Sequence, residues 1–288
     1  MKYFIAGVIA GLVFGTAAIF IRLLQAMDSM SIAFWRLIIG SLALLPLTLR
    51  SERCKGYSKF ILLMGLTLSF HFMFFIESVK QTSILNATIL VNTAPIQALI
   101  LSFLMLKVKP SRLETIAVIL GFSGASIVTF SSGELSGATL GDILALVSGT
   151  LLSLYAIIGY VARSRHGINT LYFMSRVYFI AAIITLAFII IIGRKLELPI
   201  TPPDITYVLC LGFVPTGIGH TLAIYSLKEL KAYETETLAL LEPLSATTLA
   251  YIMFSETPRV NSIIGSLIII CSLIILGYAK TISYKGKR

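Results

Sequence analysis

The sequence predicts an all-α integral membrane protein whose ten transmembrane helices form two inverted five-helix repeats. Three observations support this fold class. Of the 288 residues, 57% are hydrophobic and 12% are charged, whereas a soluble domain carries roughly 25% charged residues. The charged residues gather in short clusters that separate long apolar runs. Finally, the second half of the chain repeats features of the first half.

The apolar runs have the length of membrane spans. A helix needs about 17–25 residues to cross the hydrocarbon core of a bilayer. The runs are apolar on every side, which excludes the period-two alternation of a transmembrane β-barrel. We expect one helix in each of ten runs: Phe4–Ile21, Ile32–Leu49, Phe60–Val79, Ala87–Leu106, Leu113–Phe130, Leu140–Ala162, Tyr172–Ile192, Ile205–Leu227, Glu234–Phe254 and Val260–Ala279.

The segments between the runs are short, which limits the chemistry outside the membrane. The longest, around Gly193–Asp204, has no room for a folded domain. No phosphate-binding G-x-x-x-x-G-K-[ST] motif occurs in the sequence. Cys54, Cys210 and Cys271 show no disulfide or metal-ligand spacing and are expected to be small packing residues. We therefore expect no cofactor, no bound metal and no enzymatic activity.

The net charge of +10 is explained by its distribution across the membrane. If the spans alternate in direction, sixteen of the 23 Lys and Arg residues fall on the side that carries both termini. Five fall on the other side: Arg22, Lys80, Arg194, Lys195 and Arg259. Basic residues are enriched in cytoplasmic loops. The sequence therefore predicts a cytoplasmic-membrane protein with both termini in the cytoplasm, and it gives no reason to expect a nucleic-acid partner.

Two prolines inside apolar runs reveal an internal repeat. Pro95 and Pro243 are 148 residues apart, and Pro110 and Pro258 are separated by the same distance. Near the start of each half the offset is 138, where Ala10–Ile19 aligns with Ser148–Ile157.

The repeat divides the chain into residues 1–135 and 136–288, with five spans in each part. Five is an odd number, so the second part enters the membrane from the opposite side. Inverted repeats of this kind are typical of secondary transporters, whose substrate site lies near the bilayer midplane.

The residues around Pro243 carry a family resemblance. Leu240–Ala246 reads LLEPLSA, Phe254–Pro258 reads FSETP, and Pro95 lies midway along the fourth span. With two five-helix halves, the whole chain resembles the EamA branch of the drug/metabolite transporter superfamily. In the first half, Leu106–Pro110 has lysine and valine where the family pattern has a glutamate. The resemblance implies a transporter that exports or exchanges small polar metabolites, amino acids and related compounds among them, by alternating access.

Pro95 and Pro243 are expected to kink their helices and to expose backbone carbonyls to a polar cavity. Glu242 lies beside the second kink, where a charged side chain costs at least about 2.5 kcal/mol. Its carboxyl group either binds a substrate amine or a coupling proton, or bonds a neighbouring helix. The other cavity candidates carry hydroxyl, amide, phenol or imidazole groups: Thr16, His71, Asn92, Gln97, Ser153, Tyr155 and His220.

Charged residues near the ends of spans predict two gates. Arg36 with Glu77 would close the mouth opposite the termini, and Arg176, the repeat mate of Arg36, would close the other mouth with Glu234 or Glu236. The alternative is that both arginines reach the lipid headgroups as membrane anchors.

Two other functions remain open from the sequence. Gly121–Gly124 reads GFSG, which allows an intramembrane serine protease built from Ser123 and His220. A channel is the second alternative. The expected partners are a small-molecule metabolite and the lipid bilayer, with the chain acting as a monomer or homodimer.

Overall fold

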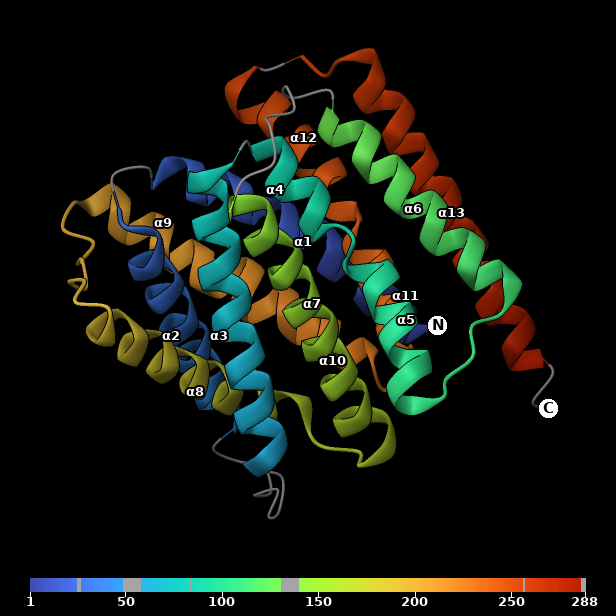
Figure 1. The fold of residues 1–288 in the computed structure, drawn as a ribbon, viewed down its shortest axis with the longest axis horizontal. Helices are drawn as coiled ribbons and strands as arrows, with labels where there is room; N and C mark the ends of the chain where they lie inside the picture. Colours follow the sequence, from blue (N-terminus) through green and yellow to red (C-terminus); the bar gives the residue numbers. More distant parts are fainter. Residues whose placement is uncertain (25–26, 49–57, 83, 131–139, 256, 286–288) are drawn as a thin grey trace.

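A computed structural model describes residues 1–24, 27–48, 58–82, 84–130, 140–255 and 257–285 (Figure 1). The described residues form α-helices, with two short π-helical segments labelled η. The elements are α1 (Lys2–Leu23), α2 (Ser29–Thr48), α3 (Ser58–Gln81), α4 (Ile84–Val91), α5 (Ala94–Leu106), α6 (Arg112–Phe130), α7 (Leu140–Tyr160), η1 (Val161–Arg165), α8 (Thr170–Ile191), α9 (Pro202–Leu211), η2 (Gly212–His220), α10 (Thr221–Ser226), α11 (Ala232–Ala239), α12 (Leu241–Phe254) and α13 (Val260–Lys285).

These elements confirm the predicted ten-span, all-α fold. Within the described ranges, ten helical stretches are long and apolar enough to cross a membrane, and each overlaps one predicted run. Four of them contain more than one element: α4 with α5, α7 with η1, α9 with η2 and α10, and α11 with α12. We call the side where α1 begins and α13 ends the terminal side, and the other the distal side; in Figure 1, α1 begins right of the centre and α13 ends at the lower right.

The fourth and ninth spans are broken near their prolines. Asn92 and Thr93 separate α4 from α5, and Pro95 lies in the first turn of α5. Leu240 separates α11 from α12, and Pro243 lies in the first turn of α12. Proline suits a first turn, because the N–H groups there have no carbonyl partner within the helix. Each span thus consists of two half-helices that meet inside the membrane.

The two broken spans also end alike. Lys107 follows α5 and Ser255 follows α12, and both have φ of 56°. This left-handed conformation is uncommon for residues other than glycine. The two residues are 148 positions apart, the same separation as the prolines. The repeat is therefore visible in backbone geometry as well as in sequence.

Extensive helix packing joins one half of the chain to the other. α6 packs on α13, α2 on α8, α3 on α7, and α1 on α12. Two glycines show the symmetry of these contacts. A Cβ atom at Gly11 would lie 2.1 Å from the carbonyl oxygen of Leu238, and one at Gly149 would lie 3.4 Å from that of Leu90. Gly149 is the repeat equivalent of Gly11 at the offset of 138, and Leu238 is the repeat equivalent of Leu90 at the offset of 148. The glycine of each half therefore contacts the leucine of the other half.

One contact breaks this symmetry. The terminal-side halves of the broken spans, α5 and α11, pack against each other, whereas the distal halves α4 and α12 make at most a marginal contact among the described residues. Burial follows the same division. Every side chain from Ala232 to Leu238 in α11 is buried, but in α12 only Leu241 is. The bundle is therefore tighter on the terminal side than on the distal side.

Candidate functional site

A buried arginine occupies the middle of the bundle. Arg36 lies two turns into α2 and is 5% exposed. Its Nε atom donates a hydrogen bond of 3.0 Å to Thr216 Oγ1. Its guanidinium carbon lies 3.9 Å from the centre of the Phe72 ring, a cation–π distance. These two contacts hold the planar group in place and leave other guanidinium N–H groups for further acceptors.

Thr216, which accepts the hydrogen bond from Arg36, lies in the π-helical segment η2. This segment contains Pro215, and π-helical turns occur often at functional sites. Tyr178 fixes it from α8: its hydroxyl group donates to the carbonyl oxygen of Thr216 at 2.7 Å and lies 3.1 Å from Thr221 Oγ1. The sequence analysis did not select Thr216 or Tyr178. The proline and three glycines within Gly212–His220 are a sequence signal, not used above, that this helix is irregular.

Both membrane histidines lie close to the arginine, in aromatic surroundings. His71 Nδ1 is 2.9 Å from Ser148 Oγ and 3.1 Å from the Ser148 carbonyl oxygen. The ring of His220 packs on the rings of Phe14, Phe72 and Tyr155, with centroid distances of 4.7, 5.5 and 6.0 Å. The site thus has apolar walls around a small number of polar groups, which is typical of small-molecule pockets.

Two carboxyl groups complete the centre. Glu242, at the start of α12, is partly buried and interacts electrostatically with Arg36. Glu236, in α11, is 7% exposed and interacts electrostatically with Glu242 and Tyr155. We call Arg36, Glu236 and Glu242 the central triad. It brings one guanidinium group and two carboxyl groups together beside the break between α11 and α12.

The remaining cavity candidates bond locally or across the first broken span. Thr16 Oγ1 donates to Val13 in its own helix. Ser153 Oγ donates to the Ala94 carbonyl at 2.8 Å. Gln97 connects Thr93 and Thr150, with distances of 2.7 Å to each. The Asn92 side-chain nitrogen is buried and has no partner within the described residues.

The predicted gate pairs are not formed in this structure. Glu77 is 3.8 Å from Arg194, whereas Arg36 is buried against Thr216 and Phe72. The Arg194 guanidinium also reaches Asp28, at 3.3 Å. Arg194 lies in the connection between α8 and α9, so a comparison of charged residues near the ends of the spans did not identify it as the partner of Glu77.

On the terminal side, Glu234 pairs with Lys280 at 2.9 Å, while Arg176 lies 4.8 Å from the Tyr172 ring centre. Glu236 belongs to the central triad. The predicted partners of Arg176 therefore contact other groups.

A buried ionic cluster closes the terminal side and was not predicted. Lys231 Nζ donates to Glu114 Oε1 at 2.7 Å, and the Tyr233 hydroxyl donates to Glu114 Oε2 at 3.1 Å. Glu234 and Lys280 lie beside this pair, on α11 and α13. We call Glu114, Lys231, Tyr233, Glu234 and Lys280 the terminal-side cluster. It joins α6, α11 and α13 on the terminal side.

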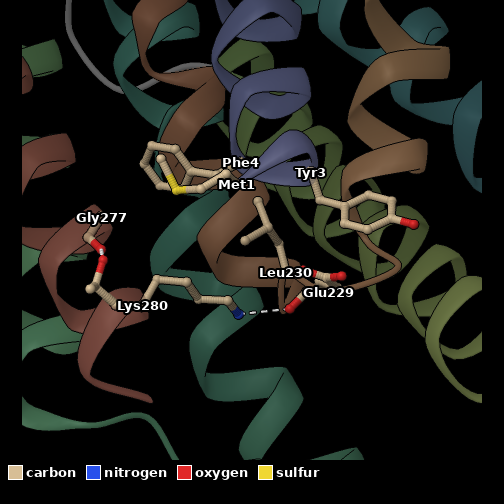
Figure 2. Close-up of a pocket in the computed structure, with 8 residues that line it drawn as sticks. Met1, Tyr3, Phe4, Glu229, Leu230, Gly277 and Lys280 are labelled. Carbon is tan, nitrogen blue, oxygen red and sulfur yellow. Dashed lines mark hydrogen bonds between the residues drawn. The ribbon is translucent and has the colours of Figure 1, made fainter. Parts of the chain in front are cut away.

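A small pocket of about 180 Å³ lies beside this cluster, lined by Met1, Tyr3, Phe4, Glu229, Leu230, Gly277, Lys280 and Thr281 (Figure 2). Lys280 Nζ reaches across it to the Glu229 carbonyl at 2.7 Å. The pocket lies at the start of α1 and the end of α13, away from the central triad.

Ser123 and His220 are not brought together. Ser123 Oγ donates to Ile119 within α6, and His220 packs among the aromatic rings of the centre. In the part of the chain that is described, no group of three or more His, Cys, Asp or Glu side chains has a metal-binding arrangement.

Comparison with known proteins supports a transport role. The chain is 29% identical over 274 residues to an uncharacterized transporter of Archaeoglobus fulgidus, and the match covers 93% of both chains. It is 25% identical over 265 residues to an uncharacterized transporter of Clostridium kluyveri, covering 87% of this chain and 84% of the other. These relatives suggest a transporter rather than an enzyme.

The fold and the repeat also have counterparts. A crystal structure superposes with a TM-score of 0.82 over 95% of both chains, at 15% sequence identity, which compares the fold alone. The model of the EamA-like transporter family matches the chain twice, over residues 1–130 and 139–278. Together these matches span nearly the whole sequence, and the chain belongs to the EamA-like transporter family of membrane transporters.

Proposed function

We propose that this transporter moves zwitterionic metabolites, amino acids and their close relatives, across the cytoplasmic membrane. The observation that carries the proposal is that the buried guanidinium group of Arg36 interacts electrostatically with the carboxyl group of Glu242, beside the break between α11 and α12. A guanidinium group binds a carboxylate through two parallel hydrogen bonds, and a carboxyl group accepts hydrogen bonds from an ammonium group. A ligand with both groups satisfies both residues, and the rings of Phe14 and Phe72 favour an apolar side chain.

Alternating access is the proposed mechanism, with the terminal side in the cytoplasm. The contact between α5 and α11, and its near absence between α4 and α12, support a state that is open toward the distal side. If each repeat adopted the conformation that the other has in this structure, α4 would pack on α12 and α5 would separate from α11. Inverted repeats supply two such related states. The direction of transport is export or exchange, coupled to protons.

Ligand-dependent thermal stability tests the recognition of a zwitterion. The purified protein is heated with each of the common amino acids, and with two analogues of leucine: 3-methylbutylamine, which lacks the carboxylate, and 4-methylpentanoate, which lacks the amine. A ligand at 100 times its Kd stabilises the state it binds by about 2.7 kcal/mol. We expect a leucine-like amino acid to raise the melting temperature more than either analogue does.

Matched variants identify the groups responsible. Arg36→Gln and Glu242→Gln are each expected to weaken amino-acid binding about tenfold or more, because each removes one charged partner. Arg176→Gln, at the repeat mate of Arg36, serves as the control and should bind normally. Equal stabilisation by leucine and both analogues, or normal binding by Arg36→Gln and Glu242→Gln, would contradict the proposal.

Transport in proteoliposomes separates alternating access from a channel. An exchanger accumulates labelled amino acid faster when unlabelled amino acid is inside the vesicle, because the loaded carrier returns quickly. A channel shows no such stimulation and conducts current. Saturable uptake without stimulation from the other side, together with ionic current, would refute alternating access.

A further inference from the structure

Glu236 is a buried acid that the zwitterion site does not use. It is 7% exposed and lies on the part of α11 where every side chain from Ala232 to Leu238 is buried. Among the described residues, no hydrogen bond or ion pair reaches its carboxyl group. Its electrostatic neighbours are the carboxyl group of Glu242 and the phenol of Tyr155. Neither neighbour supplies a positive charge.

The other charged groups near α11 face away from Glu236. Glu234 is two residues earlier, on the opposite side of the helix, where Lys280 of α13 and the Glu114–Lys231 pair lie. The helices α1 and α5 also pack on α11; α5 has no ionisable side chain, and those of α1 are near its ends. From α7 only Tyr155 approaches, and Arg36 of α2 interacts with Glu242 instead. Among the described residues, no lysine or arginine side chain forms an ion pair with Glu236.

An isolated carboxylate at membrane depth is unstable. Transfer of an unpaired charge from water to such a site costs so much that the group is neutralised by a proton instead. Acids in this position mark proton pathways in pumps and transporters. The location of Glu236 fits such a path, since it lies on the terminal-side half of the broken span, next to the substrate-binding acid Glu242.

We propose that Glu236 is the binding site for the proton that is exchanged for substrate. This inference rests on the proposed zwitterion site at Arg36 and Glu242. When that site is empty, a carboxyl oxygen of Glu236 forms an O–H bond with a proton taken from water on the distal side. When an ammonium group binds Glu242, its positive charge stabilises the Glu236 carboxylate. The O–H bond then breaks, and the proton passes to water on the terminal side.

This coupling makes proton and substrate competitors. By thermodynamic linkage, if the ammonium group promotes proton release, the proton must weaken ammonium binding to the same extent. For one competing proton, the apparent affinity for leucine falls by up to about tenfold for each pH unit below the midpoint of Glu236 protonation. Glu236→Gln resembles the protonated state, so it should bind leucine weakly and without this pH dependence.

The first experiment needs no ligand. Infrared difference spectra of the purified protein after a pH jump report the C=O stretch of each carboxyl group that gains a proton. We expect a band that is absent in Glu236→Gln, shifted in Glu236→Asp and unchanged in Glu77→Gln, a control at the distal surface. An identical band in the wild type and in both Glu236 variants would overturn the proposal.

The second experiment measures coupling. Leucine is added to weakly buffered protein with a pH indicator, and the protons released are compared with the leucine bound. We expect about one proton per leucine in the wild type and in Glu77→Gln, and none in Glu236→Gln. Leucine binding without proton release in the wild type would refute the coupling. Failure of every amino acid to bind would instead refute the zwitterion site, while the infrared band still decides the role of Glu236.

Discussion

Substitution of Gly11 by alanine tests the helix contact on which the centre depends. The added Cβ would lie 2.1 Å from the Leu238 carbonyl oxygen and 3.1 Å from the Leu241 Cβ. Ordinary contact begins at 3.4 Å, so α1 and α11 must separate by about 1.3 Å. A backbone oxygen cannot rotate away, as a side chain can. Overpacking typically costs about 1–3 kcal/mol, and this site belongs at the upper end.

A gain in helix propensity offsets part of that cost. Alanine is favoured over glycine inside a helix by at most about 1 kcal/mol, which leaves a net destabilisation of about 2 kcal/mol for Gly11→Ala. Gly277 is the matched control: it also lies in a helix, but its added Cβ would meet the flexible Phe4 side chain at 3.4 Å. Gly277→Ala should therefore be neutral or stabilising by up to about 1 kcal/mol.

The assay is thermal unfolding of the purified proteins in the same detergent, followed by size-exclusion retention. For a chain of this size, about 2 kcal/mol corresponds to a decrease of roughly 4–8 °C in melting temperature. The melting temperature should fall in Gly11→Ala and should rise or stay unchanged in Gly277→Ala. A Gly11→Ala protein as stable as wild type, or an equal loss in both variants, would refute the close approach of α1 to α11.

Two further predictions concern orientation and the terminal-side cluster. In a chain without native cysteines, a cysteine at Ile200 should react with an impermeant thiol reagent added outside cells, and one at Arg165 only after lysis; the reverse would invert the assigned topology. Lys231→Ala leaves Glu114 buried without its ammonium partner and should destabilise the protein by about 2–4 kcal/mol, whereas Arg194→Ala, at a 42% exposed arginine, should cost less than about 1 kcal/mol. Thermal unfolding separates the two, and equal losses would contradict the importance assigned to burial.

The sequence predicted the spans and the positions of the helix breaks because both depend on local chemistry. Apolar length specifies a span, and a proline cannot continue the hydrogen bonding of the helix before it. Both signals can be read from a few neighbouring residues, such as those around Pro95 and Pro243. Tertiary packing is not required to see them.

Side-chain partners could not be predicted in the same way. A helix that is apolar on all sides gives no periodic signal for its orientation. The direction in which Arg36 points therefore depends on how α2 packs on α8 and η2, and the sequence pattern does not contain that information. Glu77 was paired with Arg36 by depth alone, whereas Arg194, which contacts it, lies beyond the end of α8. Glu234 and Glu236 lie on opposite faces of one helix and therefore have different partners.

The packing of each half against the other has a consequence for biosynthesis. α1, α2, α3 and α6 take their largest contacts from α12, α8, α7 and α13, which the ribosome makes later. Residues 1–130 can thus insert into the bilayer but cannot complete their helix packing. The Nε group of Arg36 has no Thr216 to bond until the second half of the chain has been made. Lipid, water or an insertion factor must accommodate that arginine in the interval. The duplicated half is a unit of sequence and symmetry, while its helix packing is completed by the other half.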